Sequence, residues 1–211
     1  QRTVDWVKKW HPGEIAGKFE AAQIDASEPS LVVELAKKHK VDYILNAVEP
    51  KFVQSVFQAA LDAGVNYLDM AMSLSHAHPE DPFNKPAEKL GDWQYDKHED
   101  FKRAGLLALI GIGAEPGISN IFARYAADHL FSEIDDISIL DGGNLVVTND
   151  EGEEIFAPSF SIWTVIEECL NPPLIWEKDR GWFTTRPFSE PELFEFPEGI
   201  GPIKCVNVEH E

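Results

Sequence analysis

Two carboxylates stand directly after apolar runs, where a folded chain can present them to a bound molecule. Asp69 follows Val65-Asn66-Tyr67-Leu68, and Glu115 lies in the glycine-rich stretch after Leu109-Ile110. A carboxylate at the end of a buried strand can hold a polar group of a ligand or exchange a proton with it. Asp69 and Glu115 are therefore candidate site residues.

The stretch from Leu109 to Asn120 predicts a buried strand, a tight glycine turn and then a helix with Pro116 in its first position. The N–H groups and dipole at such a helix start favour an anion or a polar substrate group. Ser119 and Asn120 are expected to bind substrate. A plain strand-to-helix connection is the alternative. The residues of this turn that we expect to contact a cofactor are Gly113, Pro116 and Gly117.

The elements that must position these groups alternate between strands and helices. Apolar runs predict strands over 19–24, 41–48 and 65–69. The strand over 41–48 is almost entirely apolar, so we expect it to be covered on both faces. Helical spacing predicts helices over 3–10, 52–63 and 96–104. A further helix is expected to begin at Pro29, with Ser27 as its N-cap. This alternation is typical of βαβ units and a parallel sheet, and a long polar insertion, 72–95, interrupts it.

A parallel sheet of this kind often holds a dinucleotide at the carboxyl ends of its strands. The candidate cofactor contacts at these ends are Asp25 and Ala26 after one strand, and Asn46, Ala47 and Val48 after the next. Each is also an ordinary residue for ending a strand. The usual G-x-G-x-x-G turn is absent, since Gly111, Gly113 and Gly117 have a different spacing.

The pattern changes after residue 131. Alternation over 134–140 and in later runs predicts a largely antiparallel sheet, with one helix over 160–170. We therefore expect two domains: an incomplete dinucleotide-binding domain over 1–131 and a substrate-binding and dimerisation α+β domain over 132–211. Arg180 and Arg186 could clamp a substrate carboxylate, or could be solvated surface charges.

Composition limits the possible partners. The formal net charge of −19 argues against nucleic acid and anionic membranes, because both require a basic surface. The two cysteines, Cys169 and Cys205, are far apart in the sequence, which favours reduced thiols in the cytoplasm. No apolar run approaches the length of a membrane span. His76-x-His78 suggests a metal-dependent hydrolase only weakly, and we expect no metal site.

Three segments together resemble a known family. They are Val41 to Phe52, Ala59 to Ala71 and Gly111 to Asn120, and in order and spacing they are similar to the saccharopine dehydrogenase family. The family includes saccharopine reductases, lysine 6-dehydrogenases and carboxynorspermidine dehydrogenases. The resemblance implies a Rossmann domain, a second domain that often builds a homodimer, and NAD or NADP as cofactor. Glu115-Pro116-Gly117 replaces the family's usual Asp-Pro-Gly.

The resemblance implies hydride transfer at a carbon–nitrogen bond of an amino-acid or polyamine-like substrate. In this reading Asp69 and Glu115 are the expected catalytic groups, which orient the substrate amine or move its proton. A catalytically silent member that serves as a binding or assembly module is the alternative. Because the glycine-rich loop is absent, we expect the chain to be a fragment that binds dinucleotide poorly on its own. The sequence does not choose the substrate or the preference between NAD and NADP.

Overall fold

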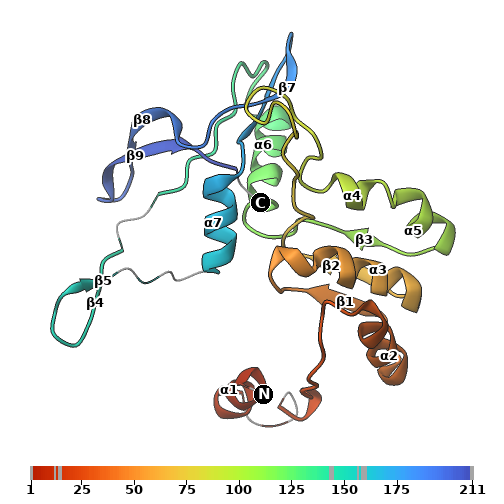
Figure 1. Ribbon diagram of the computed structural model, residues 1–211. Coiled ribbons are helices and arrows are strands. Elements are labelled where there is room, and N and C mark those ends of the chain that lie inside the picture. The colour runs from red at the N-terminus through yellow and green to blue at the C-terminus, as the bar shows by residue number, and fades with distance from the viewer. Residues whose placement is uncertain are drawn as a thin grey trace.

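The computed structural model describes residues 2–11, 13, 16–142, 145–155, 157 and 161–209. A three-stranded parallel sheet lies at its centre in the order β1-β2-β3, with strands Tyr43–Asn46, Asn66–Asp69 and Ala108–Leu109. Ile44 pairs with Tyr67 and Asn46 with Asp69, so the side chains that end β1 and β2 are neighbours. The sequence-based expectation of a parallel sheet is confirmed. All three strands end at the same edge, where the candidate site lies (Figure 1).

Helices cover one face of this sheet. They are α2 (Pro29–His39), α3 (Val53–Ala63, after the 3-10 turn Pro50–Phe52) and α5 (His98–Ala104). Phe57 of α3 is at the centre of the core, with its ring centroid 4.7 Å from that of Tyr67 and 4.8 Å from that of Phe101. The opposite face is open among the described residues, since Tyr43 and Leu45 are each 60% exposed. The expectation that 41–48 is covered on both faces is therefore wrong.

The prediction of a strand over 19–24 is also wrong. Residues 19–24 are extended and exposed but join no sheet, and they are preceded by α1 (Arg2–Trp10) and the short 3-10 turn Ala16–Lys18. A cleft of about 1150 Å³ separates residues 20–24 from β1, so no hydrogen-bonded ladder connects them. In the doubly wound strand order 3-2-1-4, the third and fourth strands are not neighbours. Sequence periodicity cannot show such a separation.

Two helix starts differ from expectation. Glu28, not Ser27, precedes α2, because the Ser27 backbone N–H and hydroxyl both donate to the Asp25 carboxylate. Pro116 is not in the first turn of α6 (Ile118–His129). The helix begins after Gly117, whose N–H donates to Asn120 Oδ1 at 2.9 Å. Pro116 therefore belongs to the turn before the helix, and its peptide bond with Glu115 is cis.

The insertion over 72–95 follows a defined path and ends in the short helix α4 (Asp92–Tyr95). The Ser73 carbonyl accepts a hydrogen bond from the Gly91 N–H, which closes the insertion at its base. Trp93 of α4 packs edge-on against Phe57, with ring centroids 5.7 Å apart. The insertion is therefore anchored in the core of the parallel-sheet region.

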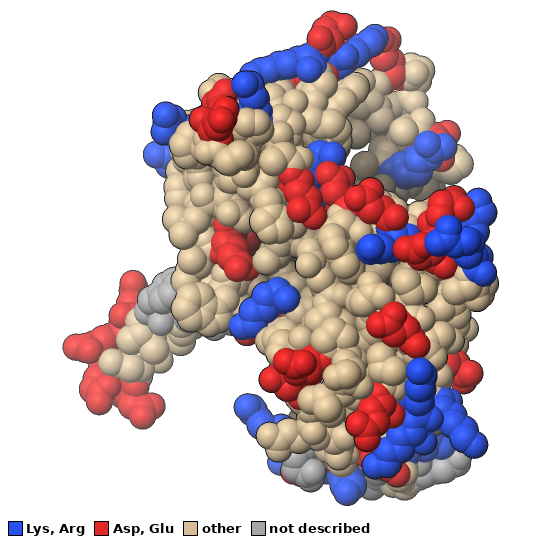
Figure 2. Space-filling view, turned by 45° about the vertical axis from the view of Figure 1, so that its right-hand side comes forward, with Lys and Arg blue, Asp and Glu red and all other residues tan. Residues whose placement is uncertain are grey.

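The second half contains three antiparallel hairpins rather than one sheet. They are β4–β5 (Val147–Thr148 and Glu154–Ile155), β6–β7 (Leu174–Glu177 and Gly181–Thr184) and β8–β9 (Ser189–Phe196 and Gly201–Asn207). The helix α7 (Ile162–Leu170) confirms the expected helix; Ser161 is its N-cap, and residue 160 lies outside the described residues. Residues 134–140 form no strand, so that prediction is wrong. The β4–β5 hairpin projects from the body and carries a group of acidic side chains (Figures 1 and 2).

The described helices include none with the length and apolar character to cross a membrane.

Candidate active-site cleft

A cleft of about 1000 Å³ lies at the carboxyl ends of β1 and β2. Its walls come from the segment after β1, the end of β2, the turn between β3 and α6, Asp141, and α7 with the residue before it. Six of the residues proposed from the sequence line the cleft: Asn46, Ala47, Val48, Asp69, Gly113 and Glu115. Both proposed catalytic carboxylates thus belong to one cleft.

The Asp69 carboxylate lies below the surface of the cleft, and the residue has no exposed area. Its Oδ1 accepts the Gly111 backbone N–H at 2.6 Å, and its Oδ2 accepts Gln94 Nε2 at 2.7 Å. Burial raises the pKa of Asp69, while the hydrogen bonds from Gly111, Gln94 and Tyr67 lower it. The carboxylate is therefore engaged by groups of the protein itself.

Asn46 is similarly engaged. Its Nδ2 donates to the Tyr67 hydroxyl at 3.0 Å, and its Oδ1 accepts the Val48 N–H at 3.3 Å. Burial raises the pKa of Tyr67, with a further contribution from the charge of Asp69, so this phenol stays protonated. These contacts fix the backbone of Ala47 and Val48 along the edge of the cleft.

Glu115 reaches the cleft from the turn between β3 and α6 and is partly exposed. This turn is held closely against the end of β2. The Ile112 N–H donates to the Asp69 carbonyl at 2.9 Å, and a Cβ added at Gly113 would lie 2.5 Å from the Met70 carbonyl oxygen. The tight approach at Gly113 explains why a glycine is required there.

Other proposed residues do not line this cleft. Ser119 and Asn120 lie in the first turn of α6, where Asn120 caps the helix. Asp25 makes a local turn with Ser27, and the Ser27 hydrogen bonds lower its pKa. Ala26 lines the neighbouring cleft beside β1, together with Asn46, Ala47 and Val48. Binding roles for these residues, and for Pro116 and Gly117, stay predictions.

The two arginines also lie elsewhere. The Arg180 guanidinium stacks on the Phe183 ring, 3.3 Å from its centroid, and Arg186 lies 4.6 Å from the centroid of the Phe83 ring. Neither lines the cleft at the strand ends. Their proposed role as a carboxylate clamp stays a prediction that this arrangement does not support.

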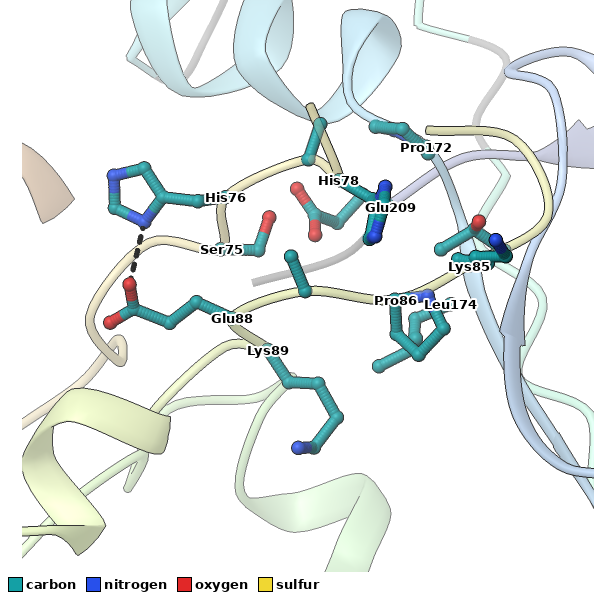
Figure 3. A pocket seen from close by; sticks show the side chains of 13 residues that line it. Ser75, His76, His78, Lys85, Pro86, Glu88, Lys89, Pro172, Leu174 and Glu209 are labelled. Carbon is teal, nitrogen blue, oxygen red and sulfur yellow. Dashed lines mark ion pairs between the residues drawn. The ribbon is translucent and has the colours of Figure 1, made fainter. Parts of the chain in front are cut away.

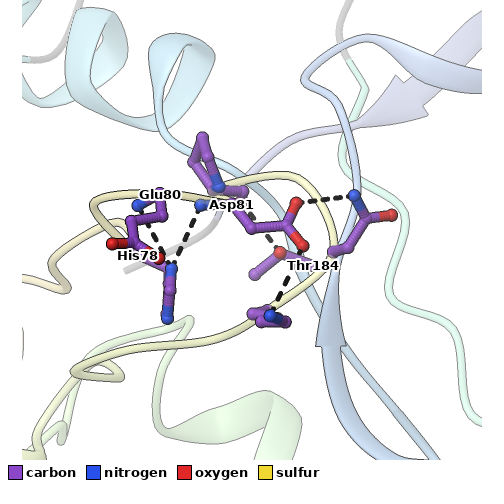
Figure 4. A network of polar contacts seen from close by, with 7 residues as sticks. His78, Glu80, Asp81 and Thr184 are labelled. Carbon is purple, nitrogen blue, oxygen red and sulfur yellow. Dashed lines mark hydrogen bonds and ion pairs between the residues drawn. The ribbon is translucent and has the colours of Figure 1, made fainter.

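The two loop histidines fasten the insertion instead of facing the cleft. His76 Nδ1 pairs with Glu88 Oε2 at 3.0 Å (Figure 3). His78 Nδ1 accepts the backbone N–H groups of Glu80 and Asp81 (Figure 4). The described residues include no group of three or more His, Cys, Asp or Glu side chains placed to hold a metal ion. The metal-dependent alternative therefore gains no support from the geometry.

The second half contacts the insertion beside these histidines. Thr184 Oγ1 donates to the Pro82 carbonyl at 2.8 Å (Figure 4). Glu209 is buried next to Ser75 in the small cavity of Figure 3 and accepts a hydrogen bond from Asn171 at 2.7 Å. Burial raises the pKa of this carboxyl. The contacts connect the second half to the loop that leaves β2.

Sequence reasoning missed several residues of the cleft. Gln94 lies under it, and three further acidic side chains line it: Glu49, Asp141 and Glu168. Glu168 comes from α7, about one hundred residues beyond β2, so no local pattern could connect the two. The described lining includes five acidic residues and no lysine, arginine or histidine. Glu49 is already paired with Lys51, whose Nζ lies 2.5 Å from Glu49 Oε2, and Asp69 is buried and bonded to Gly111 and Gln94. The lining still carries Glu115, Asp141 and Glu168, and such a surface attracts cations.

The comparisons with known proteins identify the family and the fold. The family model for the saccharopine dehydrogenase NADP binding domain matches residues 9–109. A carboxynorspermidine synthase of Vibrio alginolyticus is 31% identical over 194 residues, which are 92% of this chain and 44% of that protein. The chain belongs to the saccharopine dehydrogenase family.

Two further matches extend the comparison. A carboxyaminopropylagmatine dehydrogenase of Synechocystis sp. is 36% identical over 124 residues, which are 59% of this chain and 29% of that protein. The fold is similar to apo saccharopine dehydrogenase (L-Glu forming) from Saccharomyces cerevisiae, with a TM-score of 0.54 and 16% identity, over 99% of this chain and 43% of that one. The chain thus spans less than half the length of the relatives that it matches.

The edge of the sheet can be tested for its fit to the family's cofactor, NAD or NADP. Ala26 and the segment Asn46–Val48 line the cleft beside β1, and the same segment with Gly113 lines the cleft at the strand ends. Two adjoining clefts that share the residues 46–48 offer room for an elongated ligand. Ala26, residues 46–48 and Gly113 would face such a ligand and stay the candidate cofactor contacts.

Proposed function

We propose that this chain supplies the cofactor edge and part of the substrate cleft of an NAD(P)-dependent oxidoreductase that acts at a carbon–nitrogen bond of a polyamine-like substrate. The observation that supports this most is the acidic lining of the cleft at the carboxyl ends of β1 and β2. A protonated amine is favoured beside carboxylates, whereas a substrate with several carboxylates is repelled. Two relatives support the proposal by their names, carboxynorspermidine synthase and carboxyaminopropylagmatine dehydrogenase.

The nicotinamide supplies or accepts the hydride when the cofactor is bound. Glu115, on the turn that enters the cleft, is proposed to orient the reacting amine and to hold or release its proton. Asp141 and Glu168 are proposed to attract the remaining ammonium groups of the substrate. Residues 46–48 are proposed to position the cofactor along the edge of the sheet.

The experiment uses the natural full-length polypeptide with NADP⁺ or NAD⁺ and three candidate substrates: carboxynorspermidine, carboxyaminopropylagmatine and saccharopine. Formation of the reduced nicotinamide is followed by absorbance. We expect turnover with one of the first two and little with saccharopine, which carries more carboxylates. Preferred oxidation of saccharopine would contradict the polyamine proposal. Cofactor binding without turnover of any substrate would favour the silent binding module instead.

A charge variant tests the cleft itself. Glu168→Gln removes one carboxylate of the lining, and Glu151→Gln makes the same change on the projecting β4–β5 hairpin, where the side chain is exposed. We expect Glu168→Gln to raise KM for the amine substrate by about 5- to 150-fold, the effect of 1–3 kcal/mol in a charge-assisted contact. Glu151→Gln should leave KM unchanged. Equal KM values for the two variants would contradict the assignment.

A further inference from the structure

The strongest buried polar network of the described residues lies directly under the candidate site. Gln94 is 3% exposed and Asp69 is wholly buried. Gln94 Nε2 donates to Asp69 Oδ2 at 2.7 Å, and Gln94 Oε1 accepts the Ser73 backbone N–H at 2.7 Å. A carboxylate can only accept and a backbone N–H can only donate, so these two partners fix the orientation of the Gln94 amide.

The other oxygen of Asp69 connects this network to the turn between β3 and α6. Asp69 Oδ1 accepts the Gly111 N–H at 2.6 Å, and the Asp69 carbonyl accepts the next N–H, that of Ile112, at 2.9 Å. Two consecutive amides of the turn are thus bonded to one residue at the end of β2. Glu115, four residues after Gly111, is carried into the cleft by the same turn.

We propose that Asp69 and Gln94 are positioning residues: together they hold the turn 111–117 against β2, so that the insertion over 72–95 sets the place of Glu115 in the cleft. Asp69 has its oxygens occupied by Gly111, Gln94 and Tyr67, so it acts through these contacts and does not exchange a proton with substrate. The inference rests on the proposed function for its activity readout only.

The hydrogen-bond pattern allows a reciprocal exchange of side chains. Asp69→Asn alone places an amide NH₂, which can only donate, against another donor, either the Gly111 N–H or Gln94 Nε2. Rotating the Gln94 amide removes that clash but turns its NH₂ toward the Ser73 N–H, which is also a donor. Gln94→Glu alone sets two carboxylates face to face. The double variant D69N/Q94E restores the bonds to Gly111 and Ser73 and the bond between the two side chains: the introduced asparagine accepts from Gly111 and donates to the introduced glutamate, which also accepts from Ser73.

The experiment measures kcat and KM of the natural full-length polypeptide carrying D69N, Q94E or both. Each single variant should lower kcat by about 5- to 150-fold, the equivalent of one buried polar group left unpaired. The double variant should recover most of kcat with an unchanged pH profile. Loss of turnover in a double variant whose turn is restored would mean that Asp69 itself transfers a proton, which overturns the proposal.

A second readout is independent of activity. Hydrogen exchange of the Ser73, Gly111 and Ile112 amides should be faster in each single variant and return to the wild-type rate in D69N/Q94E. Gln58 and Asp62 form the same kind of pair on the exposed side of α3, with Gln58 Nε2 2.8 Å from Asp62 Oδ1, so Q58E and D62N are matched controls and should change neither readout. If hydrogen exchange does not return to the wild-type rate in the double variant, Asp69 and Gln94 do not hold the turn as proposed. If the wild type shows no turnover, the proposed function is refuted, but the positioning role is not.

Discussion

Adding a single methyl group at Gly117 should disrupt the turn that carries Glu115. Gly117 has a φ of +138°, which L residues rarely adopt, and a Cβ at this position would lie 2.1 Å from the Gly113 carbonyl oxygen and 2.8 Å from its carbonyl carbon. Both contacts are to backbone, so no side-chain rotation relieves them. Gly117→Ala must therefore move Gly113 or the start of α6.

The expected cost follows from two contributions. A sparsely populated backbone conformation costs about 1–3 kcal/mol, and overpacking costs about 1–3 kcal/mol more. Gly105→Ala is the matched control. Gly105 also has a positive φ, of +69°, but nothing lies within 4 Å of its added Cβ. Its substitution should cost only the left-handed strain of about 1–2 kcal/mol.

Urea unfolding of the two variants measures this difference, provided that the dependence of the unfolding free energy on urea stays constant between them. We expect Gly117→Ala to lose about 2–6 kcal/mol and to lower turnover, since Glu115 shifts with the turn. Gly105→Ala should retain full turnover. Equal losses in the two variants, with turnover intact in both, would refute the close approach of Gly113 and Gly117.

Two further predictions concern the core and the contact between the two halves. Phe57→Ala should lower the free energy of unfolding by about 3–5 kcal/mol, because Phe57 is 1% exposed and packs against Tyr67, Trp93 and Phe101. A loss of less than about 1 kcal/mol, measured by urea unfolding, would contradict the central place of Phe57 in the core. Glu209→Gln should gain stability relative to the wild type as pH rises above the ordinary pKa of 4.5, because burial raises the folded-state pKa and the unfolded carboxyl then releases its proton first. The gain is about 1.4 kcal/mol for each unit by which the two pKa values differ, and superimposable stability–pH curves for the two proteins would show that Glu209 is not buried as described.

Local patterns predicted the elements that depend on neighbouring residues. The periods of α2, α3 and α6 and the runs of β1 and β2 were sufficient to place Asn46 and Asp69 at one edge of a parallel sheet. Sequence order also placed Glu115 at the same edge. These features follow from side-chain periodicity and from the direction of parallel strands, both of which the sequence contains.

Long-range partners could not be predicted in the same way. Residues 19–24 have the composition of a strand, but whether they pair depends on which segment lies beside them. Gln94 reads as one polar residue in a polar insertion, and only the folded chain shows it buried against Asp69. Glu168 reaches the cleft through the packing of α7, which no motif near β2 encodes.

The outer edge of β1 affects how this chain behaves at high concentration. Among the described residues β1 is an edge strand, and Tyr43 and Leu45 expose apolar area beside its unpaired backbone groups. Strand edges of this kind are templates for intermolecular β-pairing, and proteins usually protect them with charges, prolines or bulges. β1 itself, Tyr-Ile-Leu-Asn, has none of these. The strand whose end lines the candidate cleft therefore also offers an edge at which two copies of the chain can pair.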